Sequence, residues 1–533
     1  MGLNFLRFLI KNFFLILGLL FSAYFLVNLF LLIPYFLPAG DDLFGAKQLL
    51  DKGFWGMNSF IFMSWDARYT ATFLSSSFFY LGGLDHYWLS GLFLLIASFF
   101  SYYFLFAQIM PKDSEPQNLK NSCYRHWRLF SFTLVFLISY LAISKPGATG
   151  GADFVLVGQF LYNAGSYCYQ TSLIFSFLIL GCLIQYFKKP KKLTFFIILF
   201  LLFLLAGTNE GTAILLVLVL LYGVYQTSLN KIFLKQKINS KNLNTWLWFV
   251  LALIIFMVFV IKSPGDQARI LYYQLKPDQF PGTYDFVLSF GISLWQTFFV
   301  LFYFLLNPLT WLLACIFYPE LKLFRQFRKN FLPKEDYWLI FIGLIFMGFF
   351  LVAWEMACFA PPRYYGVMAT LGFFLVLDFL AGLGEFIKLK MSFLNKNYFS
   401  YFLISFQIFL FFILIIFNHI FIPVLSDLIQ SRPIAQQFDQ IYFSIVQELK
   451  TAQKLGKKEI ILRRDQLLPQ TPILDYFIAV QNAHIQNLVT EDQRRASLAK
   501  DLAVYYGVDN VVLESPDGKS SIPIKRQSLV KKS

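Results

Sequence analysis

Residues 193–228 read LTFFIILFLLFLLAGTNEGTAILLVLVLLYGVYQTS, a nearly unbroken apolar run of 36 residues. As a single helix this run would be about 54 Å long, whereas the hydrocarbon core of a bilayer is about 30 Å thick. Basic residues flank both ends of the run, at 188–192 and 231–237, which places both flanks on the same side of a membrane. The run therefore predicts a helical hairpin that turns within residues 207–211.

Each arm of this hairpin is short. An arm of about 14–18 residues spans only about 21–27 Å at helical rise, so the turn should lie below the outer surface of the membrane. Non-helical backbone at such a depth is tolerated only where it lines a cavity or is buried in protein. We expect Asn209 and Glu210 to project into an outward-facing cavity and to bind substrate there. The alternative is that both residues only cap the following helix, a contribution of about 0.3–1 kcal/mol for the carboxylate.

The composition is that of a polytopic membrane protein. The chain is 58% hydrophobic and 20% aromatic, with 14% charged residues and a mean hydropathy of +0.60. A formal net charge of +15 would suit a nucleic-acid partner if it formed one patch, but the basic residues are spread through short loops. We therefore expect membrane lipid, and no nucleic acid, around the chain.

Eleven apolar runs are predicted to cross the membrane as an all-α bundle. They lie at 12–36, 87–109, 129–144, 168–187, 193–206, 211–228, 245–262, 288–318, 337–355, 364–386 and 400–425. With the N-terminus inside, the inner segments hold 22 Lys and Arg residues and the short outer segments hold 8. This asymmetry predicts a multi-pass protein of the cytoplasmic (inner) membrane, with its N-terminus inside and its C-terminal part outside.

The long first outer loop, residues 37–86, begins with the adjacent carboxylates Asp41 and Asp42. A charge at the centre of a bilayer costs about 2.5–3.5 kcal/mol, so an acidic pair at the mouth of a bundle indicates a functional site. Asp66 and Arg68 follow in the same loop, which also contains an apolar piece at 71–83 that is too short to cross. We expect this piece to lie along the membrane interface.

Two later outer segments repeat the pairing of acidic and basic residues. Asp266 precedes Arg269, and Glu355 precedes Arg363 and Tyr364. A planar guanidinium forms bidentate, charge-assisted hydrogen bonds with phosphate, so these residues predict a cavity that binds a phosphate ester. In the alternative interpretation both arginines extend to the interface or form structural ion pairs with the neighbouring acids.

Other kinds of site lack their motifs. The five cysteines show no paired spacing and are expected to be small buried apolar residues, and the four histidines are far apart. There is no glycine-rich phosphate loop with a following lysine. We therefore expect no zinc, haem or nucleotide cofactor.

The composition changes near residue 427, where the long apolar runs end. Residues 1–426 are predicted to form the transmembrane domain, and 427–533 a small extracytoplasmic α/β domain. Within the latter we predict helices over 435–455 and 494–506, and strands at 459–462 and 511–514.

The chain resembles the GT-C class of membrane glycosyltransferases and a less characterised bacterial group related to that class. The resemblance lies in short motifs spread over most of the chain: Gly40-Asp41-Asp42, Trp65 to Arg68, Asn209-Glu210, Pro264-Gly265-Asp266 with Arg269, and Tyr505-Tyr506-Gly507. It implies a GT-C-like bundle that transfers a sugar, with inversion, from a polyprenyl-phosphate donor. The acceptor would be a cell-envelope glycan or lipid at the outer face of the membrane.

The resemblance also implies roles for the acidic pair. Asp41 or Asp42 would match the catalytic acid of the first loop and act as the general base, with Asp41 favoured. Some members of the class hold a divalent ion at this acid, so Mg²⁺, Mn²⁺ or Ca²⁺ at Asp41 and Asp42 is an open option. Two other functions remain open, a transporter or flippase of lipid-linked sugars and a non-catalytic envelope-assembly protein. The second of these would tolerate replacement of both acids.

Overall fold

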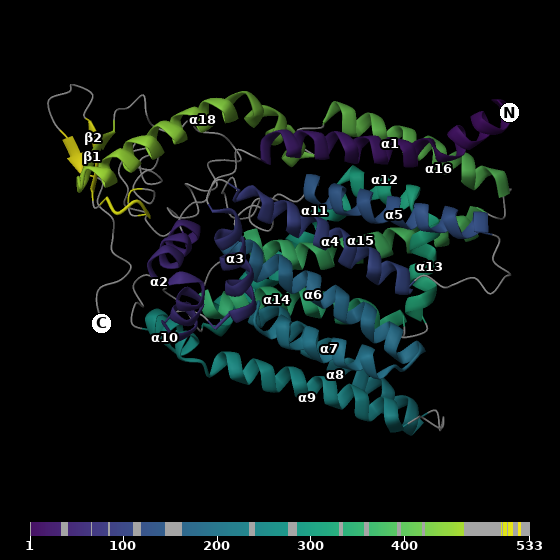
Figure 1. The fold of residues 1–533 in the computed structure, drawn as a ribbon. Helices are drawn as coiled ribbons and strands as arrows, with labels where there is room; N and C mark the ends of the chain where they lie inside the picture. The colour runs from purple at the N-terminus through teal and green to yellow at the C-terminus, as the bar shows by residue number, and fades with distance from the viewer. Residues whose placement is uncertain are drawn as a thin grey trace.

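The computed structural model describes residues 2–33, 41–64, 67–83, 86–109, 119–143, 163–233, 240–274, 285–329, 334–356, 362–391, 396–417, 422–462, 503, 505–508, 510–514 and 521–523. Nearly all of these residues are helical (Figure 1). In the described residues the helices are α1 Gly2–Leu32, α2 Asp41–Ser64, α3 Tyr69–Gly82, α4 Trp88–Ile109, α5 Leu119–Ile143, α6 Asn163–Lys188, α7 Lys192–Ala206, α8 Glu210–Phe233, α9 Ser240–Ile261, α10 Pro264–Gln274, α11 Phe286–Leu306, α12 Pro308–Ile316, α13 Tyr318–Lys329, α14 Lys334–Met356, α15 Pro362–Met391, α16 Lys396–Ile416 and α18 Pro423–Lys454.

The helices confirm the prediction of a multi-pass membrane bundle. Within the described ranges, eight are long and apolar enough to cross a membrane: Phe13–Leu32, Trp88–Ile109, Tyr124–Ile143, Tyr167–Lys188, Glu210–Ser228, Asn242–Ile261, Phe286–Leu306 and Tyr365–Ile387. Three shorter apolar helices, Lys192–Ala206, Trp338–Trp354 and Ile404–Ile416, fall in the remaining predicted runs. Each of the eleven runs thus overlaps one of these apolar helices, and the number that cross the membrane stays a prediction.

Two predicted runs differ from the structure in their extent. The run at 288–318 is interrupted between α11 and α12, where the Asn307 side chain accepts a hydrogen bond from the Leu309 amide at 2.9 Å. Proline at the first helical position has no amide hydrogen to satisfy, so Asn307-Pro308 starts a new helix. The last run was expected to reach residue 425, but α16 ends at Ile416 and α18 starts at Pro423.

The two ends of the bundle carry different elements (Figure 1). The start of α1 and the helix α13 lie at one end, whereas α2, α3, α10 and the C-terminal strands lie at the other. The first group belongs to the segments predicted inside, and the second to the segments predicted outside. We call the second end the α2 end below.

The predicted hairpin is confirmed, and its turn is buried in protein. Helices α7 and α8 are joined at residues 207–209, and Thr208 and Asn209 are almost fully buried. The Gly207 carbonyl accepts hydrogen bonds from the Thr70 and Ala71 amides, at 2.9 and 3.1 Å. The first amides of a helix have no partner within that helix, so the hairpin turn supplies a cap for α3.

Tyr69, the first residue of α3, also contacts the hairpin. Its hydroxyl donates a hydrogen bond to the Phe203 carbonyl at 2.5 Å, and the two rings stack with centroids 4.9 Å apart. Burial raises the pKa of the Tyr69 phenol, so this hydroxyl stays protonated and remains a donor. The predicted interfacial piece at 71–83 is therefore a helix that the hairpin anchors at its start.

Gly207 is required by this close approach. A Cβ atom there would lie 2.4 Å from the Tyr69 ring and 2.6 Å from Thr70 Oγ1. We expect Gly207→Ala to lower the free energy of unfolding by about 1–3 kcal/mol, because the hairpin and α3 must separate to admit a methyl group. Thermal unfolding in detergent measures this loss. Gly291→Ala in α11, where nothing lies within 4 Å, is the matched control and should be neutral or slightly stabilising.

The C-terminal part contains a three-stranded sheet. Strand β1 (Glu459–Leu462) pairs in parallel with β2 (Asn510–Glu514), which pairs antiparallel with β3 (Ser521–Pro523). The two predicted strands are confirmed, and β3 was missed because three residues are too few to show an alternating pattern. Helix α18 covers the predicted helix at 435–455 and continues unbroken through residue 427, the predicted domain boundary. The predicted helix at 494–506 lies largely outside the described residues.

Ion pairs tie helices together at the end opposite α2 and α3. Arg128 of α5 pairs with Glu320 of α13 at 2.5 Å, and Arg325 of α13 lies 3.3 Å from Glu385 of α15. Gly382 leaves the space that the Arg325 guanidinium occupies, because a Cβ there would lie 2.4 Å from Nη1. These contacts fasten α13 across the helix ends.

Candidate functional site

Asp42, the second acid of the predicted pair, is buried at the start of α2. It is 1% exposed, and the Tyr87 hydroxyl donates a hydrogen bond to Oδ2 of its carboxylate. Tyr87 immediately precedes α4, so this bond fixes the beginning of α2 against the beginning of the next long helix. A phenol that donates to a carboxylate favours its charged form, and it also fixes the orientation of the two oxygens.

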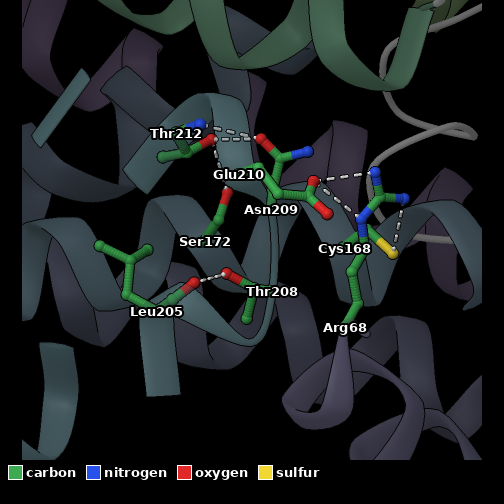
Figure 2. A network of polar contacts seen from close by, with 8 residues as sticks. All are labelled: Arg68, Cys168, Ser172, Leu205, Thr208, Asn209, Glu210 and Thr212. Carbon is green, nitrogen blue, oxygen red and sulfur yellow. Dashed lines mark hydrogen bonds and ion pairs between the residues drawn. The ribbon is translucent and has the colours of Figure 1, made fainter. Parts of the chain in front are cut away.

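Arg68 and Glu210 form an ion pair across 142 residues of sequence (Figure 2). Arg68 Nε and Nη2 lie 3.2 and 3.0 Å from Glu210 Oε2, and both side chains are about one-sixth exposed. Arg68 Nη1 also lies 3.9 Å from the Cys168 sulfur of α6. The predicted residues from the first loop and from the hairpin turn therefore meet, and the guanidinium is fixed between α6 and α8.

Asn209 caps the start of α8, as the alternative interpretation predicted. Its side-chain oxygen accepts hydrogen bonds from the Thr212 amide at 2.9 Å and from the Thr212 hydroxyl at 3.0 Å. Ser172 of α6 donates to the Thr212 hydroxyl at 3.1 Å, which ties the cap to the neighbouring helix (Figure 2). Asn209 is 4% exposed. It positions the turn and leaves Glu210 to face Arg68.

The beginning of α6 connects the two pairs. Cys168 contacts Arg68, and the preceding residue, Tyr167, is fully buried with its hydroxyl near Ser90 and Asp42. The Tyr167 hydroxyl makes no hydrogen bond of good geometry with any of the described groups. Of two adjacent residues of one helix, one thus lies near the acid of α2 and the other contacts the arginine that precedes α3. The two pairs belong to one polar region at the α2 end.

Asp266 lies at the same end, in a helix that packs against α2. It is 3% exposed, and its amide donates to the Ser263 hydroxyl at 3.3 Å, as at the start of a capped helix. The side chains of the remaining predicted residues fall outside the described part of the structure. Asp66 is not described, and for Asp41, Arg269, Glu355, Arg363 and Tyr364 only the backbone is, at their places in α2, α10, α14 and α15.

Sequence reasoning missed Tyr87, Tyr167 and Cys168. A tyrosine at the end of an apolar run is typical of the aromatic belt at a membrane interface, so the two tyrosines carried no distinct signal. Cys168 was expected to be a small buried apolar residue, which is wrong, because it is half-buried with its sulfur beside a guanidinium. The partners of Tyr167 and Cys168 follow from the packing of α6 against α3, and that of Tyr87 follows from the position of the start of α2.

The described donors do not make a site for a divalent ion by themselves. Magnesium and calcium take about six or more oxygen ligands, several of them carboxylates or carbonyls. The Asp42 carboxylate accepts a hydrogen bond from the Tyr87 hydroxyl and lies near the hydroxyl of Tyr167. Among the described residues no group of three His, Cys, Asp or Glu side chains could hold a metal. The arrangement offers instead a fixed carboxylate and a fixed cation in one polar region.

Comparison of the chain with models of protein families, with curated proteins and with solved structures found no match.

Proposed function

We propose that the chain is a membrane glycosyltransferase of GT-C type. It moves a sugar from a polyprenyl-phosphate donor to a cell-envelope glycan or lipid acceptor, with inversion, at the outer face of the cytoplasmic membrane. One observation carries this proposal: the Arg68–Glu210 pair contacts Cys168 of α6, and the preceding residue, Tyr167, lies near the Asp42 carboxylate that Tyr87 binds. An acid and a cation are the two groups that transfer from a phosphate donor requires.

The acidic pair supplies the base in this proposal. Asp42, held by Tyr87, anchors the first turn of α2, and Asp41 accepts the proton of the acceptor hydroxyl as that oxygen attacks the anomeric carbon. General bases of this kind contribute about 10²–10⁴-fold to a rate. The bond from the anomeric carbon to the phosphate oxygen breaks as the new bond forms on the opposite face, which inverts the centre.

The arginine stabilises the leaving phosphate. Charge builds on the departing polyprenyl phosphate, and a preorganised guanidinium stabilises it without further reorganisation. Glu210 holds Arg68 in position before the donor binds, because the two side chains are already joined at 3.0 Å. The lipid tail of the donor remains in the membrane, which keeps the phosphate at the end of the bundle. The hydroxyls of Tyr87, Tyr167 and Ser90 orient the polar groups near the Asp42 carboxylate.

A donor panel tests the proposal. Purified protein is given radiolabelled polyprenyl-phosphate sugars and a cell-envelope lipid fraction as acceptor, with and without a chelator. We expect transfer with at least one donor, and loss on chelation would assign the divalent ion to the site. Protein that binds these donors and moves them across vesicles without transfer would favour the transporter. Binding with neither transfer nor transport would favour the assembly role.

A further inference from the structure

A buried aromatic cluster beside the acid includes a residue from the far C-terminal part of the chain. The cluster consists of Ala46 of α2, Phe79 of α3 and Tyr87, and the side chains of Leu49 and Tyr505 pack against it. Its three members are 4–6% exposed, and the Phe79 and Tyr87 rings have centroids 5.9 Å apart. Tyr87 is the residue that donates to the Asp42 carboxylate. Tyr505 therefore packs against the cluster that contains the group that orients the acid.

The backbone around Tyr505 is anchored by its own hydrogen bonding. Gly507 has φ +74°, and the Val508 amide donates to the Ala503 carbonyl at 2.8 Å, as in a helix that ends with a left-handed glycine. Ala503 and Val508 are fully buried. The two consecutive rings point in different directions, since the planes of the Tyr505 and Tyr506 rings stand at 87° to each other. Tyr506 packs against the main core, whereas Tyr505 reaches the cluster around Tyr87.

We propose that Tyr505 is a positioning residue that holds the Tyr87 hydroxyl on Asp42, so that the C-terminal sheet and the acidic first loop act as one unit. Strand β2 begins two residues after Val508, so the sheet fixes Tyr505 directly. The catalytic consequence rests on the proposed function, whereas the packing itself does not. Removal of the ring frees Tyr87 and loosens the start of α2.

Kinetics of three variants test the role. We expect Tyr505→Ala to lower kcat by about 10–100-fold with little change in KM, because a displaced acid misplaces the base without altering donor binding. Tyr505→Phe keeps the ring and should restore the wild-type kcat. Tyr506→Ala is the matched control, because it removes the neighbouring ring from the same segment. If the loss of a ring here does not by itself impair catalysis, kcat should change less than about twofold. A Tyr505→Ala variant with wild-type kcat, or a Tyr506→Ala variant that loses as much, would overturn the proposal.

Two further measurements test the packing of Tyr505 independently of sugar transfer. In a background without the native cysteines, a short bifunctional thiol reagent should crosslink Leu49→Cys to Tyr505→Cys, because both side chains pack against the same small cluster, and it should crosslink Asp51→Cys to Tyr505→Cys much less. Hydrogen exchange of the α2 amides should be faster in Tyr505→Ala than in wild type. If the wild-type protein transfers no sugar, the proposed function fails while these two results still decide the role of Tyr505. A missing Leu49–Tyr505 crosslink or unchanged exchange would contradict it.

Discussion

Replacement of Asp41 by asparagine is expected to lower the turnover of sugar transfer by about 10²–10⁴-fold, because the amide cannot accept the proton of the acceptor hydroxyl. The donor KM should change little, since Arg68 is untouched. Asparagine has the same shape as aspartate, so the folded protein should be retained. Steady-state kinetics with a radiolabelled donor measure the effect. The paired variant Asp42→Asn should keep more activity, because its amide oxygen can still accept from Tyr87.

The chain offers a matched control for this substitution on the same helix. Asp51 of α2 is 48% exposed at its side chain and pairs with Lys47 at 3.0 Å in an ordinary surface contact. Such pairs contribute about 0–1 kcal/mol, so Asp51→Asn should leave both turnover and stability near wild type. Full activity in Asp41→Asn would show that Asp41 is not the general base. Full activity in a variant that carries both Asp41→Asn and Asp42→Asn would contradict a general base at the acidic pair.

Replacement of Arg68 by glutamine should reduce both stability and transfer. Glu210 would keep a carboxylate that is only 17% exposed without its partner, and removal of one member of a buried pair costs up to about 3–5 kcal/mol. The loss of the guanidinium should also lower kcat by about 10²–10³-fold, as for other groups that stabilise charge in the transition state. Thermal unfolding and donor kinetics measure the two effects.

A charge reversal separates these two effects. The double variant Arg68→Glu with Glu210→Arg keeps an ion pair between the same positions, so it should recover much of the lost stability. It should not recover transfer, because the guanidinium then starts from the hairpin turn instead of from the residue before α3. Recovery of transfer in the double variant would show that the pair serves the fold alone.

The hairpin and the apolar helices were predictable because a helix that crosses a membrane requires a long apolar run in the sequence. A run of 36 apolar residues with basic flanks on both sides allows few arrangements in a layer about 30 Å thick. The break between α11 and α12 had a sequence signal, a capping residue, Asn307, followed by Pro308. This signal lies within a long apolar run, which predicts one span. Run length alone therefore predicts spans better than it predicts where a helix stops.

The site was less predictable because its partners are distant in sequence. Glu210 and Arg68 were each expected in the outer cavity, yet nothing in either segment indicates that they pair across 142 residues. The contact of Tyr87 with Asp42 depends on how the start of α2 lies against the residue before α4, and Gly207 is required because α3 approaches the hairpin turn closely. Such contacts arise from packing between helices, which the apolar pattern of each helix does not specify.

The Cys168 thiol reports directly on the proposed phosphate site, because it lies 3.9 Å from the Arg68 guanidinium. In a variant that retains only this cysteine, with the other four replaced, its rate of modification by a water-soluble thiol reagent is measured with and without a polyprenyl-phosphate sugar. Inorganic phosphate and a neutral polyprenol serve as controls for the headgroup and the tail. We predict that the donor slows modification about tenfold or more, and that Arg68→Gln abolishes this protection. An unchanged rate with donor demonstrably bound would contradict a phosphate site at Arg68.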